Sequence, residues 1–295
     1  MGPIHGSGDG WTTCGLGHRH WGRYGAAGLL LRSALPFGGG ADGVDVLLQL
    51  RSRWSHHGGT WGIPGGARDR DESAVRAAVR EAAEEVGLTP SSVRPEAAYL
   101  DDHGGWSYTT VVASARGAVD PEPSSAETDD VRWVSDDRVE TLSLHLGFAR
   151  TWATVSAITP APVLVVDAAN TIGSRPDGWW RDRIGAVRRL RDDLTNSLSG
   201  GLTLGLDGAL PELRVFPEIV LVTEGAARGV EQAVELQVLP APGSGDDTIV
   251  EVVSRYASGP RPVLVVTADR ALRQRVGALG ATSIGPRRLL DLIPA

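Results

Sequence analysis

The sequence contains no lysine, so all 29 basic side chains of this 295-residue chain are arginine. This absence excludes Schiff-base catalysis and the phosphate-binding loop that depends on lysine, and it leaves arginine, metal or backbone groups to contact phosphate. Cysteine is nearly absent as well, since Cys14 is the single one. An intrachain disulfide is thereby excluded, which favours a reducing compartment.

Long hydrophobic runs and an excess of positive charge are missing too. No apolar run reaches membrane-spanning length, and the polar, glycine-rich N-terminus differs from a signal peptide. We therefore expect a cytoplasmic protein without a membrane partner. The formal net charge of -7 argues against nonspecific nucleic-acid binding as the main function, although a local basic groove is compatible with it.

The chain is long enough for two domains, each with its own core. The segment AITPAPV, residues 157–163, carries two prolines and no hydrophobic periodicity, so we place a boundary there. We expect domains at 1–157 and 162–295. In the first, apolar and alternating patterns predict four strands and a late helix, at 26–33, 44–52, 107–117, 129–135 and 144–157. The first two strands are expected to pair around the glycine-rich connection 36–43.

The most informative stretch is GARDRDESAVRAAVREAAEEVGL, residues 66–88. It predicts a helix whose buried face recurs at the 3, 4, 7 spacing: Val75, Ala78, Val79, Ala82 and Val86. Glu81, Glu84 and Glu85 fall on a different arc of this helix, where their carboxylates repel one another. A divalent cation such as Mg²⁺ or Mn²⁺ would remove that repulsion, so the pattern predicts a metal site that meets phosphate. An exposed, glutamate-rich amphipathic helix is the alternative.

The boundaries of this helix are also predicted by its sequence. Asp71 is expected to cap its start, and Gly87 to end it in the left-handed conformation. Gly65 and Gly66 allow the backbone before the helix to pass close to a ligand.

The same stretch resembles the Nudix box, which reads Gly, five residues, Glu, seven residues, Arg-Glu, an apolar residue, any residue, Glu-Glu, any residue, Gly and an apolar residue. The matching positions are Gly66, Glu72, Arg80, Glu81, Glu84, Glu85, Gly87 and Leu88, with Ala82 as the small apolar member. The resemblance implies an α/β/α sandwich with a mixed sheet. It also implies hydrolysis of a nucleoside diphosphate linked to another moiety, by attack of water on phosphorus.

The resemblance further implies roles for single residues. Glu84 and Glu85 would hold Mg²⁺ or Mn²⁺, and Gly65 is a candidate carbonyl ligand. Arg80 would orient a glutamate, and Glu81 would be a metal ligand or the base. Family members differ in which glutamate takes the proton, so that role stays open. A Nudix fold that binds without cleaving is the alternative.

Substrate contacts are expected outside the helix. Trp61, Trp106 and Tyr108 lie in segments near the expected cleft and could stack a base, beside the backbone of Gly66, although tryptophans of such domains are commonly core residues. Glu127, in the loop before the last strand, is a candidate further metal ligand or base. Resemblance to ADP-ribose hydrolases would require a downstream proline, and positions 103–105 read His-Gly-Gly, which disfavours ADP-ribose.

The second half predicts a doubly wound α/β domain. Short β-branched runs, typical of a parallel sheet buried on both faces, lie at 162–167, 218–223, 234–239 and 262–267, with helical patterns at 179–196 and 247–257. Ligands of such sheets collect beyond the carboxyl ends of the strands, where Asp167, Glu224 and Asp269 are expected. Asp246 and Asp247 open a helix nearby. These acids predict metal-assisted phosphodiester cleavage, or else serve as helix caps.

This half resembles the NYN branch of the PIN-like nucleases. In that family the first strand ends in Asp followed by Asn, here Asp167 and Asn170. An Asp pair and a Ser/Thr-x-Asp then complete a metal site, and the matching residues are Asp246, Asp247, Thr267 and Asp269. The resemblance implies a metal-dependent ribonuclease site, with RNA as a partner.

Near the N-terminus, Cys14, His18 and His20 have the chemistry of zinc ligands, but no fourth ligand lies close in sequence, so a surface loop is the simpler reading. Taken together, the sequence predicts a Mg²⁺-dependent nucleotide pyrophosphohydrolase with a PIN-like second domain. One alternative is an RNA-processing protein that trims 5′ ends, and another is a nucleotide sensor with a cleavage-poor Nudix site.

Overall fold

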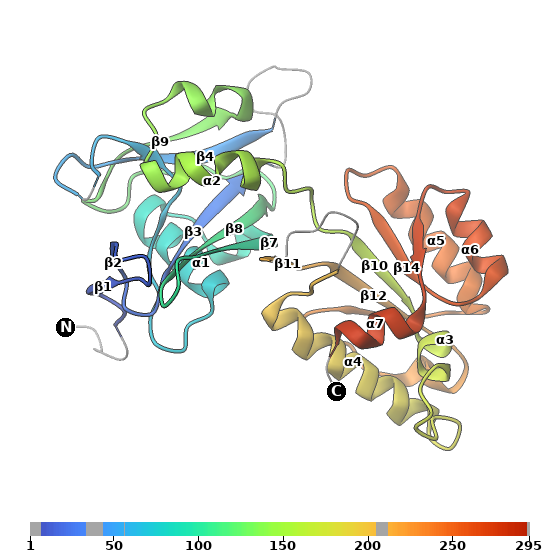
Figure 1. Ribbon diagram of the computed structural model, residues 1–295. Coiled ribbons are helices and arrows are strands. Elements are labelled where there is room, and N and C mark those ends of the chain that lie inside the picture. Colours follow the sequence, from blue (N-terminus) through green and yellow to red (C-terminus); the bar gives the residue numbers. More distant parts are fainter. Residues whose placement is uncertain (1–6, 34–43, 56, 205–211, 294–295) are drawn as a thin grey trace. The chain divides into compact units, whose positions relative to one another are not determined.

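The computed structural model describes residues 7–33, 44–55, 57–204 and 212–293, and the chain divides into two compact units (Figure 1). The first unit comprises Met1–Thr159 with Leu210–Leu213, and the second comprises Pro160–Ala209 with Arg214–Ala295. The division at Thr159 and Pro160 falls in the segment with two prolines.

The first unit is built around a mixed sheet in the strand order β7-β8-β3-β4-β5, with β6 paired to β3 and β9 paired to β4. β3 runs antiparallel to β4 and parallel to β8. A separate hairpin of two three-residue strands, β1 and β2, precedes the sheet. The strands are β1 (Trp11–Thr13), β2 (Arg19–Trp21), β3 (Ala26–Arg32), β4 (Asp45–Arg51), β5 (Trp61–Gly62), β6 (Gly65–Ala67), β7 (Val93–Asp102), β8 (Ser107–Ala115) and β9 (Thr128–Ser135).

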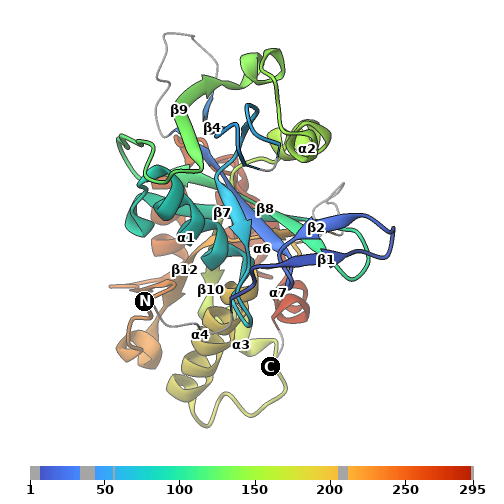
Figure 2. The same ribbon diagram turned by 90° about the vertical axis from the view of Figure 1, so that its left-hand side faces the viewer.

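Helices cover both faces of this sheet, as Figure 2 shows. α1 (Ala74–Val86) contacts β3, β6 and β8. α2 (Leu146–Ser156) lies on the other face and buries Phe148, Trp152 and Val155 against a cluster that includes Leu30 and Leu48. Two short 3-10 helices, η1 (Pro90–Ser92) and η2 (Asp136–Thr141), complete the unit. The predicted α/β sandwich with a mixed sheet is confirmed.

The ends of α1 differ in how well the sequence predicted them. Gly87 ends the helix with φ 70, as expected for a left-handed residue. The predicted cap Asp71 is wrong: Ser73 is the N-cap, and its side chain accepts a hydrogen bond from the Arg76 amide. Asp71 has φ 63, a turn conformation two residues before the cap, so its backbone cannot lead directly into the helix.

The four predicted strands of this unit are confirmed as β3, β4, β8 and β9, and the late helix as α2. The expected pairing of the first two strands is present, while their glycine-rich connection lies outside the described residues. The sequence did not predict β7. Its register shifts between Pro95 and Ala97, and a proline at such an irregularity hides the alternation that marks a strand.

The second unit contains the expected parallel sheet. Its strand order is β13-β12-β10-β14-β15, and the four pairings between these neighbouring strands are parallel. The strands of this sheet are β10 (Val163–Asp167), β12 (Glu218–Thr223), β13 (Gln237–Pro240), β14 (Val263–Val266) and β15 (Thr282–Ile284). A further strand outside this sheet, β11 (Leu213–Val215), spans the division between the two units. The helices are α3 (Ala168–Gly173), α4 (Arg183–Gly200), η3 (Gly225–Gly229), α5 (Gly245–Ala257), α6 (Arg270–Gly277) and α7 (Pro286–Leu292).

Two apolar clusters show that helices pack on both faces of this sheet. Leu164 and Val166 of β10 pack with α4, whereas the alternate residues Val163 and Val165 pack with α5 and α6. The first long helix begins four residues later than predicted because Asp182 caps it. No helix in the described ranges has both the length and the apolar composition needed to cross a membrane.

Candidate active site

Arg80 joins the acidic side chains of α1 to the loop before it. Its guanidinium donates to both carboxylate oxygens of Glu72, at 3.1 and 3.0 Å, and to Glu81 Oε1 at 2.8 Å. A longer contact of 3.3 Å reaches Glu84 Oε2, and the Ala67 carbonyl accepts at 2.9 Å. The planar fork of arginine suits such two-oxygen contacts. Arg80 therefore sets the orientation of several glutamates at once.

Glu85 lies on the buried side of α1 and is 6% exposed. Its Oε2 accepts hydrogen bonds from the Gly65 amide at 2.8 Å and from Gln49 Nε2 at 2.9 Å. Burial, with the nearby charge of Glu81, raises the pKa of Glu85 to about 7. Both hydrogen-bond donors are neutral, so a bound cation would supply the positive charge that favours the ionised carboxylate.

Glu81 lies over the backbone of Gly66. A Cβ placed on Gly66 would approach the carboxylate of Glu81 to 2.7 Å, closer than real side chains come. Position 66 therefore requires glycine if Glu81 is to keep this orientation. Burial raises the pKa of Glu81, and the ion pair with Arg80 only partly opposes this effect. Glu84 differs from both, because 59% of its side chain is exposed.

Gln49 is a site residue that we did not predict. It lies in the apolar strand β4, is 1% exposed, and accepts a hydrogen bond from Thr128 Oγ1 at 2.9 Å while it donates to Glu85. The signal was present in the sequence: one amide interrupts the run VDVLLQL, and a buried amide requires polar partners.

Tyr108 lies beside the glutamates. A Cβ on Gly65 would come within 3.0 Å of the Tyr108 hydroxyl oxygen, and burial together with the charge of Glu85 raises the pKa of Tyr108. The structure thus brings Gly65, Gly66 and Tyr108 together with the carboxylates. Their expected roles toward metal or substrate stay predictions.

The other predicted substrate and base residues lie in different surroundings. Trp61 is 8% exposed within the core beneath α2, with the Arg132 guanidinium 5.1 Å from its ring centroid. Trp106 stacks on His20, and its Nε1 donates to the Gly22 carbonyl. The side chain of Glu127 is exposed next to β9. Both indoles are packed against other side chains, as expected for core tryptophans. A role for them in stacking on a base therefore stays a prediction.

In the second unit, Asp167 is 9% exposed at the end of β10 and caps α3, where its Oδ1 accepts from the Asn170 amide. Its Oδ2 accepts from Thr267 Oγ1 at 3.1 Å. Asn170 Oδ1 in turn accepts from the Ala268 amide, and the Asp269 amide donates to Thr267. The four predicted residues Asp167, Asn170, Thr267 and Asp269 therefore form one hydrogen-bonded group.

The other predicted acids of this unit, Glu224, Asp246 and Asp247, differ in their surroundings. Burial raises the pKa of Asp167, and the negative charges of Asp246 and Glu224 act in the same direction. Glu224 accepts from the Gly245 amide at 2.9 Å. Asp247 is exposed and pairs with Arg275 at 2.7 Å. The charges of Glu224 and Asp246 therefore act on Asp167, whereas Asp247 is paired with an arginine.

A cavity adjoins these acids on the α3–α4 side. It is lined by Ala168, Ala169, Ile172, Trp179, Arg183, Val187, Glu224 and Ala227. The guanidinium of Arg183 lies 5.1 Å from the ring centroid of Trp179. An aromatic ring with an arginine over it is a surface on which a nucleobase can stack.

Comparison with known proteins identifies a family for the first half of the chain. The NUDIX domain family model matches residues 33–152. The "Putative 8-oxo-dGTP diphosphatase 3" of Mycobacterium tuberculosis is 47% identical over 155 residues, which cover 50% of this chain and 69% of that protein. A "Nucleoside triphosphate pyrophosphatase/Nudix hydrolase fusion protein" of Bifidobacterium longum is 39% identical over 156 residues, 52% of this chain and 32% of that protein. The crystal structure of the Nudix hydrolase RenU from M. smegmatis shares 46% identity and a TM-score of 0.45, covering 50% of this chain and 93% of that chain.

The sandwich fold, and a helix that carries Arg80 with three glutamates, define a hydrolase that acts on phosphorus-containing anhydrides. The chain belongs to the Nudix hydrolase family. The expected Nudix domain in the first half is thus confirmed. The PIN-like assignment of the second unit depends on its motifs and its acidic group, and it is a proposal.

Proposed function

We propose that the first unit hydrolyses a diphosphate linkage in a nucleotide, with Mg²⁺ or Mn²⁺ as the metal. One observation carries this proposal: Arg80 holds Glu81 and Glu84 beside Glu85, whose carboxylate lies against the Gly65 amide. Such an arrangement presents several hard oxygen donors on one helix face, next to a glycine backbone that leaves room for a phosphate group.

The residues present fit a divalent cation. Burial raises the pKa of both Glu81 and Glu85, so their ionised forms lack full compensation by the protein. Carboxylate oxygens are the ligands that Mg²⁺ prefers. We assign Glu84 and Glu85 as ligands, and Glu81 as a ligand or the proton acceptor. A metal held there would neutralise charge on the diphosphate oxygens and activate a water for attack.

The protein's own residues would orient the reaction. Arg80 keeps Glu81 and Glu84 directed to one side of α1, and Glu72 holds Arg80 in place through two contacts. Burial raises the pKa of Glu81, which makes its carboxylate a stronger proton acceptor than that of an exposed glutamate. In a nucleoside triphosphate, attack by water would break one anhydride bond and yield a nucleoside monophosphate and pyrophosphate.

For the substrate we propose an oxidised purine nucleoside triphosphate. The support is the relative from M. tuberculosis, which is named for 8-oxo-dGTP and is 47% identical over 155 residues. The relative from B. longum is named for nucleoside triphosphates.

A substrate panel tests this proposal. The purified full chain is incubated with 8-oxo-dGTP, dGTP and ADP-ribose, with and without Mg²⁺, and products are separated by chromatography. We expect Mg²⁺-dependent release of monophosphate and pyrophosphate, with 8-oxo-dGTP preferred over dGTP. The Glu84→Gln variant should lose activity, and Glu140→Gln, an exposed glutamate of the same unit, should keep it. Binding of 8-oxo-dGTP without any product would instead indicate the nucleotide sensor.

As a second candidate, we propose that the second unit is a metal-dependent ribonuclease of the PIN-like type. The observation that favours it is the group around Asp167, where Asn170 and Thr267 hold the carboxylate and the charges of Asp246 and Glu224 act on it. The adjoining cavity with Trp179 offers a surface on which a base can stack. Metal-assisted attack on a phosphodiester needs such converging carboxylates.

Labelled single-stranded RNA with Mn²⁺ tests the second candidate. The wild-type chain should cut it, and Asp167→Asn should not. Asp291→Asn, an exposed aspartate of the same unit, serves as the matched control. RNA left intact by the wild type, or cut equally by Asp167→Asn, would reject the nuclease assignment.

A further inference from the structure

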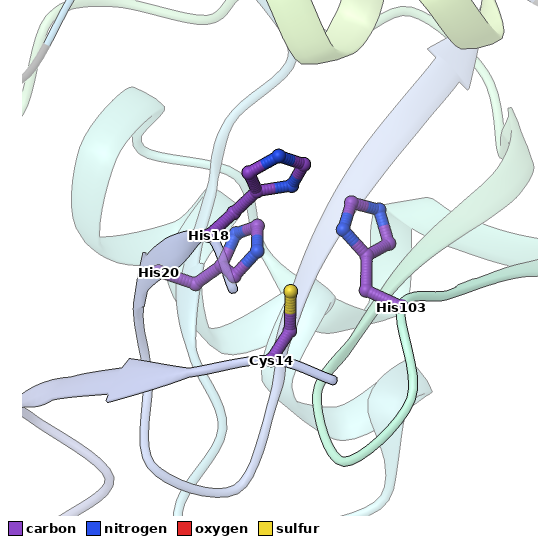
Figure 3. A group of neighbouring side chains, drawn as sticks. All are labelled: Cys14, His18, His20 and His103. Carbon is purple, nitrogen blue, oxygen red and sulfur yellow. The ribbon is translucent and has the colours of Figure 1, made fainter. Parts of the chain in front are cut away.

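Four side chains that can bind a soft metal meet at the β1–β2 hairpin. Cys14 and His18 lie in the loop of the hairpin, and His20 lies on β2. His103 comes from the turn between β7 and β8, more than 80 residues away in sequence. Figure 3 shows the four side chains directed toward one another, and their ligand atoms all lie within 4.8 Å of each other. No fourth ligand lies close to Cys14, His18 and His20 in the sequence, but the fold brings His103 next to them.

Two ring nitrogens of this group lack hydrogen-bond partners within the described part of the chain. They are His20 Nε2 and His103 Nδ1, and both are buried. A buried polar atom without a partner costs free energy unless something binds it. A metal ion among the four side chains would accept these lone pairs.

His103 also has the environment of a metal ligand. Its other nitrogen, Nε2, lies 3.1 Å from Asp101 Oδ2. Metal-binding histidines commonly donate their second ring N–H to a carboxylate, which fixes the tautomer and leaves the first nitrogen free to coordinate. With Asp101 on Nε2, the free nitrogen of His103 is Nδ1, the same atom that lacks a partner.

The spacing of the group fits tetrahedral zinc after a small contraction. Zinc bond lengths to nitrogen and thiolate place neighbouring ligand atoms about 3.3 to 3.8 Å apart in a tetrahedron. The present limit of 4.8 Å requires shifts of about one ångström or less per ligand toward a common centre, given these bond lengths. His18 is exposed and lies in a loop, so it can make such a shift.

The short β1–β2 hairpin needs contacts with the rest of the unit to be stable. β1 and β2 have three residues each and form a sheet of their own, and isolated two-stranded hairpins are marginally stable in water. The backbone already brings the two turns together, since the Gly15 amide donates to the Gly104 carbonyl at 2.5 Å. Stacking of His20 on Trp106, with ring centroids 3.8 Å apart, adds to that contact.

We propose that Cys14, His18, His20 and His103 bind one Zn²⁺ ion as a structural site that clamps the hairpin to the β7–β8 turn. Four protein ligands fill the tetrahedron and leave no open position for a substrate, so the ion stabilises structure. Nitrogen and sulfur ligands select zinc over magnesium, which separates this site from the glutamates of α1. The proposal is therefore independent of the hydrolase activity.

The clamp would also support the segment that leads into α1. At the base of the hairpin, the Gly8 amide donates to Asp69 Oδ1 at 2.9 Å, and the Arg68 amide donates to the Gly25 carbonyl at 3.0 Å. These bonds join the hairpin to the loop between β6 and α1. Loss of zinc should therefore lower the stability of the first unit.

Metal analysis of the untagged full chain tests the site. Elemental mass spectrometry should find one zinc per chain in the wild type and in Glu85→Gln, and much less in His18→Asn, where an exposed ligand is replaced. His57→Asn is the matched control, because it replaces a histidine outside the group at a positive φ of 56 that asparagine tolerates. Zinc absent from the wild type, or retained fully by His18→Asn, would overturn the proposal.

Cobalt substitution provides a test that does not depend on stability. The Co²⁺-loaded wild type should show the intense visible bands of tetrahedral cobalt and a thiolate-to-cobalt charge-transfer band in the near ultraviolet. Cys14→Ser should lose the charge-transfer band. Its persistence in Cys14→Ser, or an octahedral spectrum in the wild type, would contradict the assigned ligands.

Discussion

At the scale of single residues, Arg80 is the side chain on which the active-site geometry depends most. Its fork contacts Glu72, Glu81 and Glu84 simultaneously. Lysine keeps the charge but lacks the planar fork. We predict that Arg80→Lys lowers kcat by about 10- to 100-fold, the range seen when residues that orient metal ligands are replaced. Steady-state kinetics measure this, and Arg76→Lys, exposed on the same helix, should stay close to wild type.

Glu85 should make the metal-free protein sensitive to pH. Burial raises its pKa from 4.5 to about 7. Between these values the folded protein holds a proton that the unfolded chain releases, so the free energy of unfolding should fall as pH rises through this window. Denaturant titrations in the absence of divalent metal measure it. Adding Mg²⁺ should reverse the trend, because the cation binds the ionised carboxylate.

Because Glu85 is buried, we predict that replacing it by glutamine raises the stability of the protein while it lowers the activity. Glu85→Gln preserves the acceptor for the Gly65 amide and removes a buried charge. At pH 8 without metal, we predict that this variant is more stable than wild type by about 1–3 kcal/mol. A denaturant titration that finds the variant less stable would contradict the assigned environment of Glu85.

Residue-level prediction from sequence was only partly right for α1, because Glu85 is buried while the predicted core residues Val75 and Val79 are half-buried. The spacing of Glu81, Glu84 and Glu85 predicted an arc apart from the buried face, whereas Glu85 lies on the buried face and Glu84 is exposed. Gln49, which donates to Glu85, was not predicted, and neither was His103, which lies with Cys14, His18 and His20. Strand pairing and turn packing bring these two residues to their partners from distant positions in the sequence. No local periodicity encodes such contacts.

At the scale of elements, the close approach of α1 to β6 places Glu81 over Gly66. We predict that Gly66→Ala displaces the flexible Glu81 carboxylate and lowers activity by about 100-fold, as expected for a misplaced reacting group, with little change in Tm. Gly62→Ala is the control, since a Cβ there meets only ordinary contact at 3.6 Å. Kinetics and thermal unfolding of the two variants separate the site effect from a folding effect.

The ends of elements show why part of the fold escaped prediction. Ser73 and Asp71 are both good helix caps by composition, and only the backbone conformation of Asp71, φ 63, decides between them. β13 begins at Gln237, three residues after the predicted start, and Val234 is 99% exposed. Apolar runs therefore located strands well and their ends poorly, because ends depend on turn geometry.

At the scale of the whole molecule, the two metal sites proposed for the first unit differ in chemistry and should respond differently to metal removal. Dialysis into magnesium-free buffer should abolish hydrolysis by the carboxylate site, because oxygen ligands hold Mg²⁺ loosely with retained water. The cysteine and histidines should keep one zinc per chain through the same dialysis. Activity and zinc content are measured on the same sample, and added Mg²⁺ should restore hydrolysis. Loss of zinc together with activity would contradict the separation.

The two units differ in how much their sequences reveal. A proline-containing segment and a change from mixed patterns to β-branched runs were enough to expect two folds. The family of the first unit is indicated by a long motif with many spaced positions. The motifs of the second, such as Asp167 with Asn170, are short, and short acidic motifs also serve as helix caps, as Asp167 does for α3.

The central claim is that the glutamates of α1 hold the metal on which diphosphate hydrolysis depends. The most direct test compares Mg²⁺-dependent pyrophosphate release from 8-oxo-dGTP by the wild type, Glu85→Gln and the control Glu140→Gln. We predict a loss of about 100-fold or more in kcat/KM for Glu85→Gln alone, on the scale expected when charge stabilisation at the reacting phosphate is removed. Equal activity of Glu85→Gln and wild type would contradict the account.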